Sequence, residues 1–315
     1  MKIAVMGTGG FAVPAFRKLL QAGHEVPLLV TMPIRTRASD RLPLPEIRQV
    51  AAEFHVPIYE PDNVNESGAG ELRRAGADLL FICDYGKILS PEIITVFPLG
   101  GVNLHGSILP KYRGAAPINR AILAGETTLG VSLIHITPAV DAGPVIAVDS
   151  YEPDPADTAP VIEEALAEMG GNLLLAHLPK IEKGLDTPIP QDDSQACKAP
   201  KIRKEEGRID WTESVRQIRN RYRGLQPWPK TFSDWIRSGG KPPVRLILGP
   251  LEIAGTGADS FAPCGTVIKA DRDGILVQAG DGLVRIGGVQ PSGKKAMLPG
   301  PFLSGYRMKA GDLLQ

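Results

Sequence analysis

The regular alternation in about the first 180 residues most constrains the fold. Short runs of β-branched and aliphatic residues alternate with stretches of helical periodicity, a pattern typical of a parallel sheet with helices on both faces. The expected strands are 3–6, 26–31, 79–83, 102–104, 131–136 and 145–150. The expected helices are 11–21, 45–54, 91–96, 117–124 and 158–177, the last ended by Pro179. The pattern predicts a Rossmann-like, doubly wound, mostly parallel α/β domain over residues 1–182.

The second part of the chain has a different pattern. Residues 183–207 are rich in charged and turn-forming residues, as in a linker. A short basic helix is expected at about 213–223, followed by five strand-like runs near 230–235, 244–248, 265–269, 275–278 and 283–286. Short strands with glycine-rich turns are typical of a small barrel. The pattern therefore predicts that residues 208–315 form a C-terminal β-barrel of the oligonucleotide-binding type.

The net charge of zero conceals an asymmetry between the two parts. Residues 1–200 contain 16 Lys and Arg against 24 Asp and Glu, a net charge of −8, and residues 201–315 contain 19 against 11, a net charge of +8. A basic C-terminal part fits a polyanionic partner such as nucleic acid, because neutralising phosphates supplies affinity for any sequence. Attraction between the two domains would explain the same asymmetry, so charge alone leaves both interpretations open.

The cysteine content and the hydropathy pattern indicate the cellular compartment of the protein. Cys83, Cys197 and Cys264 lie far apart without paired spacing, which predicts neither a disulfide framework nor a metal site. The N-terminus has no signal-peptide pattern and no run of 18 apolar residues occurs, so we expect a cytoplasmic protein that does not enter a membrane.

A glycine motif after the first expected strand fits the dinucleotide-binding fingerprint, since Gly7-Thr8-Gly9-Gly10-Phe11-Ala12 matches G-x-G-x-x-A. Enzymes that use this fingerprint place an acidic residue at the end of the second strand to bind the ribose. Here that strand ends at Val30-Thr31-Met32 without one. We therefore interpret the glycines as a tight strand-to-helix turn.

Three polar residues form the strongest candidate for chemistry. Asn103 and His105 lie two apart at the end of an expected strand and so share a face, and Asp141 lies in a later glycine-containing turn. An amide can donate to the oxyanion of a tetrahedral intermediate, an imidazole can supply a proton or positive charge, and a carboxylate can orient the imidazole and collect protons. This set suits acyl transfer to an amine without a Ser or Cys nucleophile.

The segment Asn103–Asn119 together with Asp141-Ala142-Gly143 resembles the signature of the folate-dependent formyltransferases. The version Arg113-Gly114-Ala115-Ala116-Pro117-Ile118 is similar to that of the members that formylate methionyl initiator tRNA. Further similar segments occur in order along nearly the whole chain: Met6-Gly7-Thr8, Phe11-Ala12, Asp84–Leu89, Arg208-Ile209-Asp210-Trp211, Gln226-Pro227-Trp228-Pro229 and Gly293-Lys294-Lys295-Ala296-Met297.

The resemblance implies that Asn103, His105 and Asp141 are catalytic and that 10-formyltetrahydrofolate is the donor; we expect no metal. It implies a folate site made of three segments: the loop after the expected strand 79–83, the segment before Asp141 and the loop after His105. The residues it assigns there are Tyr85, Gly86, Lys87, Ile88, Leu89, Ser107, Leu109, Pro110, Ile136, Thr137 and Val140. A mostly apolar cleft with backbone hydrogen bonds suits a fused-ring ligand.

The tRNA contacts are expected in two places. Arg216, Arg219 and Arg223 share a face of the basic helix, and Lys294 and Lys295 add charge, although a solvated helix face would have the same pattern. In the family a basic loop after the second strand reaches the acceptor stem; here it is short but contains Arg35, Arg37 and Arg41. Gly9-Gly10 also replaces the Pro-Asp usual in the family, which alters the first turn rather than the chemistry.

Three other functions remain open for a chain with this catalytic trio and this basic C-terminal part. An amino-sugar-nucleotide N-formyltransferase would need the same three residues but no basic C-terminal domain. Transfer to water would make the protein a formyl-folate hydrolase, and a non-catalytic RNA-binding protein on this scaffold would not need the three residues at all. We expect a monomer, because no amphipathic helix is left over for a dimer interface.

Overall fold

The computed structural model describes residues 1–34, 44–237, 242–257 and 262–315. The chain divides into two compact units. The first unit comprises Met1–Ile118, Thr128–Pro153 and Val161–Pro200. The second unit comprises Asn119–Thr127, Asp154–Pro160 and Lys201–Gln315. The last segment of the first unit ends at Pro200, the same position that separates the part of the sequence with net charge −8 from the part with net charge +8.

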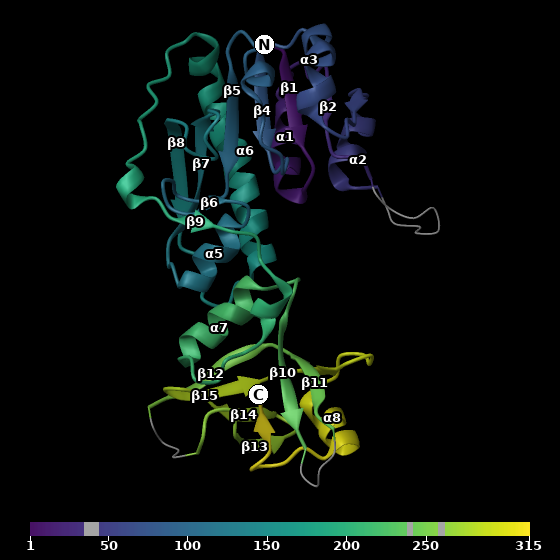
Figure 1. Cartoon of the computed structure of the whole chain (residues 1–315), viewed down its shortest axis with the longest axis vertical. Helices are drawn as coiled ribbons and strands as arrows, with labels where there is room; N and C mark the ends of the chain where they lie inside the picture. The colour runs from purple at the N-terminus through teal and green to yellow at the C-terminus, as the bar shows by residue number, and fades with distance from the viewer. Residues whose placement is uncertain (35–43, 238–241, 258–261) are drawn as a thin grey trace. The chain divides into compact units, whose positions relative to one another are not determined.

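A seven-stranded sheet forms the centre of the first unit, in the order β3-β2-β1-β4-β5-β7-β8 (Figure 1). Its strands are β1 (Ile3–Gly7), β2 (Leu29–Val30), β3 (Ile58–Tyr59), β4 (Leu79–Cys83), β5 (Gly101–His105), β7 (Leu129–His135) and β8 (Val145–Tyr151). The strands from β3 to β5 are parallel, whereas β7 is antiparallel to β5 and β8 to β7. Every residue of β1 is buried, as expected for a central strand covered on both faces.

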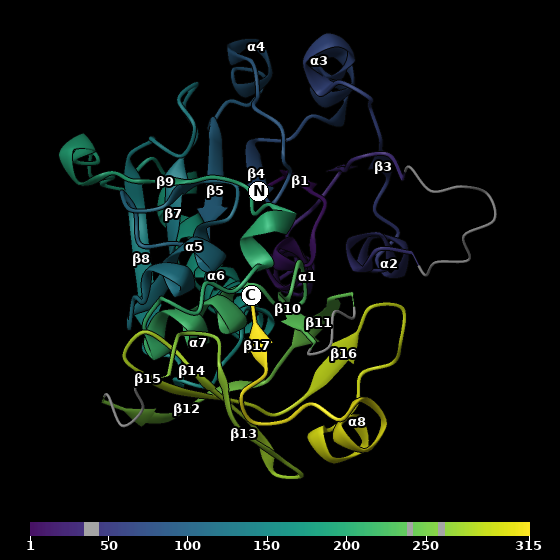
Figure 2. The same cartoon turned by 60° about the horizontal axis from the view of Figure 1, so that its bottom comes forward.

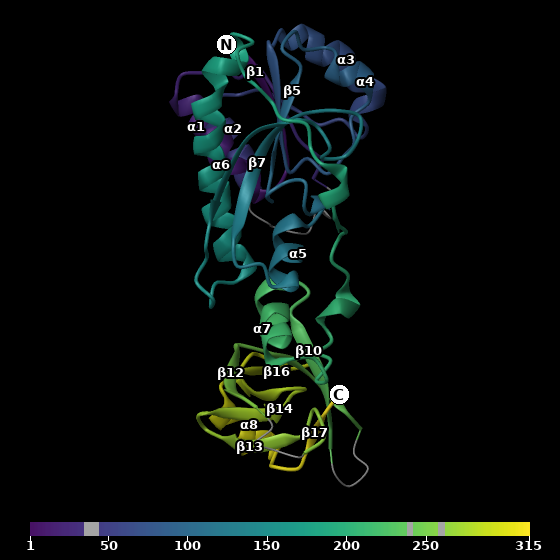
Figure 3. The same ribbon diagram turned by 90° about the vertical axis from the view of Figure 1, so that its left-hand side faces the viewer.

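Helices cover both faces of this sheet, with α1, α2 and α6 on one side and α3 and α4 on the other (Figure 3). The helices of the first unit are η1 (Gly10–Ala12), α1 (Val13–Gln21), α2 (Glu46–Glu53), α3 (Val64–Ala75), α4 (Pro91–Ile94), most of α6 (Ala159–Glu182) and η2 (Asp193–Gln195). On the second face Leu72 and Ile93 pack with Ala4 and Met6 of β1. The arrangement confirms the predicted doubly wound, mostly parallel α/β fold. Within the described residues, no helix combines the length and apolar content that a membrane crossing requires.

The expectation that Pro179 ends the long helix is wrong, because α6 continues to Glu182. A proline inside a helix removes one backbone hydrogen bond and crowds the preceding turn. Leu178 and Ile181 on either side of it are both buried, and their packing stabilises the last turn. The chain leaves the helix at Gly184, whose φ of 62° lies in the left-handed region that glycine adopts without strain.

The second unit contains two four-stranded antiparallel sheets, with the orders β16-β11-β10-β17 and β12-β15-β14-β13. Its strands are β10 (Thr231–Ile236), β11 (Val244–Leu248), β12 (Leu251–Thr256), β13 (Val267–Asp271), β14 (Gly274–Gln278), β15 (Gly282–Ile286), β16 (Val289–Pro291) and β17 (Leu313–Leu314). A bridge between Thr266 and Leu313 joins the two sheets. The antiparallel strands thus curve around one core, which confirms the predicted small barrel.

The core of the second unit is aromatic as well as aliphatic. Trp211, Trp235 and Phe302 are buried in it, and the rings of Trp235 and Phe302 meet edge to face with centroids 6.0 Å apart. The helices of this unit are most of α5 (Pro117–Ala124), η3 (Lys204–Gly207), α7 (Val215–Gly224) and α8 (Pro299–Tyr306). Figure 2 shows α8 beside β13.

Candidate active site

Strand β5 presents Asn103 and His105 on one face of the sheet. The side chain between them, Leu104, points the other way and meets α6, where a side chain at Gly170 would lie 2.4 Å from it. Alternation along the strand therefore directs both polar side chains away from α6. Asn103 is half-buried and His105 is buried, with 6% of its surface exposed.

Asp141 reaches this face through a loop rather than along a strand. Because β7 is antiparallel to β5, its last residue His135 lies beside Val102 near the start of β5. The loop of residues 136–144 then returns over β5, anchored where the backbone N–H of Ile136 donates to the carbonyl of Gly101 at 2.9 Å. Gly143 packs so closely that a Cβ there would lie 1.7 Å from the His135 carbonyl oxygen, so this turn requires glycine.

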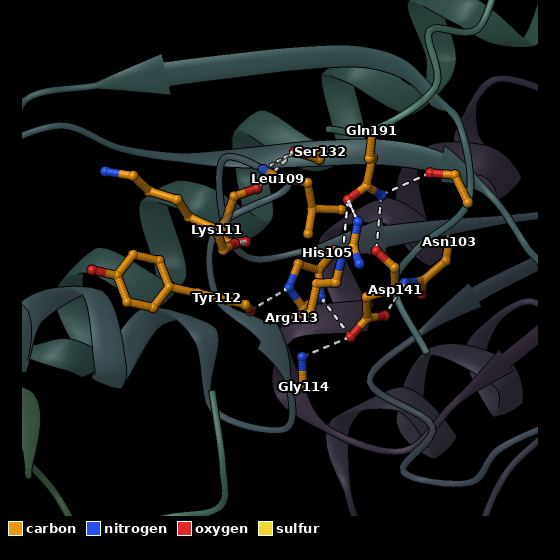
Figure 4. Close-up of polar contacts among 12 residues, drawn as sticks. Asn103, His105, Leu109, Lys111, Tyr112, Arg113, Gly114, Ser132, Asp141 and Gln191 are labelled. Atoms are coloured by element: carbon orange, nitrogen blue, oxygen red, sulfur yellow. Dashed lines mark hydrogen bonds and ion pairs between the residues drawn. The ribbon is translucent and has the colours of Figure 1, made fainter. Parts of the chain in front are cut away.

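The three predicted side chains meet in one place (Figure 4). The amide of Asn103 donates to Oδ1 of Asp141 at 3.4 Å, and Nδ1 of His105 lies 3.6 Å from Oδ2 of the same carboxylate. The backbone N–H of Gly114 donates to that Oδ2 at 2.9 Å. One carboxylate thus faces an amide, an imidazole and a backbone donor, and these groups can move a proton and donate a hydrogen bond to an oxyanion.

The loop after β5 fixes the orientation of His105. Nε2 of His105 lies 2.9 Å from the carbonyl oxygen of Tyr112. A carbonyl oxygen only accepts, so Nε2 carries the proton of this hydrogen bond and Nδ1 faces Asp141. The hydroxyl of Ser107 donates to the Lys111 carbonyl at 2.7 Å and braces the same loop.

The residues expected to bind folate differ in exposure. Tyr85, Leu89, Ser107 and Leu109 are buried; Pro110, Ile136 and Thr137 are half-buried; Gly86, Lys87, Ile88 and Val140 are exposed. The Ser107 hydroxyl is already used within its loop, and the Leu109 backbone N–H donates to Ser132 at 3.0 Å. Burial raises the pKa of Tyr85 to about 12, so its hydroxyl stays neutral at physiological pH.

Asn65 holds the loop after β4 in place. Its amide nitrogen donates to the carbonyl of Ile88 at 2.9 Å, and its amide oxygen accepts from the backbone N–H of Ser90 at 2.9 Å. This role could not be predicted from the sequence, because Asn65 belongs to α3, a helix that the hydrophobic pattern does not predict.

The arginines expected on one face of the basic helix do not share one environment. Arg216 is exposed, Arg219 is half-buried and Arg223 is buried, with 7% of its surface exposed. The guanidinium of Arg223 donates to the carbonyl of Asp157 at 2.7 Å and to Asn220 at 3.2 Å. Neighbouring segments of the second unit therefore cover Arg223, and its contact with tRNA stays a prediction. Lys294 and Lys295 are exposed. Arg35, Arg37 and Arg41 lie outside the described residues.

Residues outside the predicted site support the turn that carries Asp141. The expected linker packs against the first unit as far as Pro200: its Ile189 bridges to Val145, and the short strand β9 (Lys198–Ala199) pairs with β6 (Arg113–Gly114). Within it, Gln191 donates to the carbonyls of Asp141 and Gly143, and Asp186 lies 2.5 Å from Nε2 of His135. No short-range pattern marks these residues, because their partners lie about 50 residues away in the chain.

Comparison with known proteins agrees with this geometry. The family model described as formyl transferase matches residues 1–178, and the model described as formyl transferase, C-terminal domain, matches residues 201–307. This chain belongs to the formyl transferase family. Among its curated relatives, the methionyl-tRNA formyltransferase of Rhodopirellula baltica is 36% identical over 100% of this chain and 96% of its own length. That of Moorella thermoacetica is 36% identical over 100% and 99%.

Solved structures share the fold at lower identity. HypX from Aquifex aeolicus in complex with tetrahydrofolic acid is 18% identical, with a TM-score of 0.62 over 95% of this chain and 46% of its own. WlaRD, a sugar 3N-formyl transferase, is 18% identical, with a TM-score of 0.62 over 94% of this chain and 99% of its own. The formyl transferase fold thus extends over both units of this chain.

Proposed function

We propose that this chain transfers the formyl group of 10-formyltetrahydrofolate to the α-amino group of the methionine on initiator tRNA. The observation that carries the chemistry is the meeting of Asn103, His105 and Asp141 around one carboxylate. The choice of acceptor is supported by full-length relatives at 34–37% identity that are methionyl-tRNA formyltransferases. We assign catalysis to residues 1–182, tRNA binding to residues 208–315 and the connection to residues 183–207.

Each of the three residues has a distinct task in this proposal. The Asn103 amide donates a hydrogen bond to the oxyanion that forms when the amine attacks the formyl carbon. His105 places positive charge or a proton beside the same oxygen. Asp141 orients the imidazole and takes the proton that the amine loses as its bond to carbon forms. That proton leaves with the nitrogen of the departing donor, so no proton is gained or lost overall.

The residues assigned to the donor fit a fused-ring ligand. Ile88 and Val140 are apolar, yet 65% and 48% of their surfaces are exposed, as expected of side chains that a ligand covers. The Ser107 hydroxyl and the Leu109 N–H already have partners, so those residues and Pro110 would contribute shape rather than hydrogen bonds. When bound, the folate supplies the activated formyl group; Tyr85–Leu89 and Ile136–Val140 would hold its ring system.

The exposed basic residues of the second unit suit the acceptor. Arg216, Lys294 and Lys295 are exposed within a region of net charge +8, and Arg219, which follows Arg216 in α7, is half-buried. Such residues bind phosphates without reading bases, which would orient the tRNA. We assign a second set of phosphate contacts to Arg35, Arg37 and Arg41, and we propose that the protein acts as a cytoplasmic monomer.

A formylation assay with purified protein and 10-formyltetrahydrofolate tests the proposal. Methionyl initiator tRNA is offered in one reaction and an amino sugar nucleotide in another, with the His105→Ala variant as the control for the site. Transfer to the tRNA that is lost in the variant supports the proposal. Transfer only to the sugar would make the protein an N-formyltransferase of the kind represented by WlaRD. Formate release without an acceptor would indicate a hydrolase, and absence of any turnover a binding protein.

A further inference from the structure

The backbone of Asp141 has a conformation that needs support. Its φ is 50°, in the left-handed region that residues with a Cβ seldom adopt. Aspartate tolerates this region better than most residues, but the conformation persists only where surrounding contacts hold it. The direction of the Asp141 carboxylate depends on this turn, so whatever holds the turn also positions the carboxylate against His105.

Gln191 supplies that support from the backbone side. Its amide nitrogen donates to the carbonyl of Asp141 at 2.8 Å and to the carbonyl of Gly143 at 2.7 Å. One NH₂ group thereby joins two carbonyls of the same turn (Figure 4). Both hydrogens of that group are used, so any rotation of the Gln191 amide would break two hydrogen bonds at once.

Arg113 fixes which way the Gln191 amide faces. Its Nε and Nη2 donate to Oε1 of Gln191 at 2.9 and 2.7 Å. A guanidinium only donates, so the amide oxygen must face Arg113 and the NH₂ group must face the turn. The next residue, Gly114, donates its backbone N–H to the Asp141 carboxylate. Two adjacent residues of β6 therefore act on Asp141. Gly114 binds its carboxylate directly, and Arg113 supports its turn by orienting Gln191.

We propose that Gln191 is a positioning residue for the reaction: it holds Asp141 in its left-handed turn and so sets the place of the Asp141 carboxylate beside His105. The proposal rests on the function proposed above. Gln191 itself does not touch the reacting groups in this account. Its effect passes through the Asp141 backbone, and misplacing a reacting group by about 1 Å can cost up to about 100-fold in rate.

The test compares Gln191→Glu with Gln195→Ala. The glutamate keeps an oxygen for Arg113 but replaces the NH₂ group with an oxygen that repels both carbonyls of the turn. Gln195 is an exposed residue four positions on, and its amide donates only to Asp192 among the described residues. We expect kcat to fall by about 10- to 100-fold in Gln191→Glu, with little change in KM for either substrate, and no change in Gln195→Ala. An equal loss in both variants, or an unchanged kcat in Gln191→Glu, overturns the proposal.

A double-mutant cycle shows whether Gln191 acts through Asp141. Gln191→Ala should lower kcat in the wild-type background but add little in the Asp141→Asn background, because the carboxylate it positions is then absent. Additive losses would overturn the proposal. A readout independent of substrate is the NMR signal of the His105 imidazole, which should move in Gln191→Ala and stay in place in Gln195→Ala. If wild-type protein formylates no tRNA yet this signal moves, the proposed function fails while the positioning role stands.

Discussion

Nδ1 of His105 and Oδ2 of Asp141 lie 3.6 Å apart, at the distance of an ion pair and too far for a hydrogen bond. Both groups are held from their other sides by consecutive parts of one segment: Nε2 of His105 by the Tyr112 carbonyl and the Asp141 carboxylate by the Gly114 N–H. Backbone atoms of Tyr112 and Gly114 therefore hold the two groups at this separation, together with the turn that carries Asp141. Such fixed spacing leaves both groups in place before the substrates arrive, which is what a preorganised site requires.

The first prediction concerns these two side chains. His105→Ala should lower kcat for formyl transfer by about 10²- to 10⁴-fold, because the group proposed to supply a proton or charge to the oxyanion is lost. Asp141→Asn should lower kcat by about 10²-fold or more, because the amide can no longer take up a proton. Steady-state kinetics with methionyl initiator tRNA measure both effects.

Binding of tRNA is the control for that experiment. Neither residue belongs to the basic residues of the second unit, so the Kd for tRNA should change by less than about 3-fold in either variant. Turnover at the wild-type rate in both variants would remove His105 and Asp141 from the mechanism and with them the site assignment.

The sequence was most informative where structure is local. Residues 79–83, 117–124 and 244–248 were predicted with the bounds that β4, α5 and β11 have, because a buried strand or an amphipathic helix shows its periodicity within a few residues. The pattern failed for α3, which contains Gly68 and Gly70. Both glycines lower the helix propensity of the segment, and α3 is stabilised instead by burial of Val64 and Leu72 in the core of the first unit. Such stabilisation depends on tertiary packing and leaves no local signal.

In the candidate site, too, residues marked by a local pattern could be predicted and residues held by distant contacts could not. Asn103 and His105 could be paired from their spacing on one strand, and Asp141 from its glycine turn. Gln191 could not be found, because its contacts with the Asp141 turn join residues 48 and 50 apart in the chain. The spacing of Arg216 and Arg223 predicts one face of a helix, but periodicity does not tell which of the two a neighbouring segment covers.

The second prediction tests the close packing of the Asp141 turn. Gly143→Ala should lower the free energy of unfolding by about 1–3 kcal/mol, because the new Cβ would lie 1.7 Å from the His135 carbonyl oxygen and the turn must shift. Formyl transfer should fall as well, since the same turn carries Asp141. Thermal unfolding and an activity assay on one preparation measure both changes.

Gly70→Ala is the matched control, because Gly70 lies inside α3 with no atom within 4 Å of the added Cβ. It should raise the free energy of unfolding by about 0.5–1 kcal/mol, the usual gain of alanine over glycine within a helix. Equal behaviour of the two variants would contradict the packing described for Gly143.

The third prediction is a pH dependence in the second unit. The pKa of Asp234 is lowered, chiefly because Arg245 donates hydrogen bonds to its carboxylate at 2.9 and 3.2 Å, with a further contribution from Arg208. A lowered pKa means that the ionised form stabilises the folded state. That stability is present above the unfolded-state pKa of about 3.9 and is lost as the pH falls through the lower, folded-state pKa.

Asp234→Asn should therefore lower the free energy of unfolding at pH 7 by about 1 kcal/mol, a small value because both arginines are partly exposed. The difference from wild type should shrink once the pH drops below about 4. Denaturant unfolding at several pH values measures it, with the exposed Asp273→Asn as control. A difference that stays constant down to pH 2 would show that charge is not its cause.

The last prediction separates the exposed from the buried arginine of α7. Arg216→Gln should weaken tRNA binding and reduce the slope of log Kd against log salt by roughly 0.7–0.9, the change expected for one phosphate contact. Arg223→Gln should instead lower the free energy of unfolding by about 1–3 kcal/mol, because it removes a buried guanidinium and leaves the part-buried Asp157 carbonyl without this donor. Its effect on the salt slope should be negligible, since a buried guanidinium meets no phosphate. Fluorescence anisotropy between 50 and 200 mM KCl, paired with thermal unfolding, distinguishes the two variants. If Arg216→Gln binds tRNA with the wild-type affinity and slope, this face of α7 does not contact the tRNA, and the basic charge of the second unit must act through other residues.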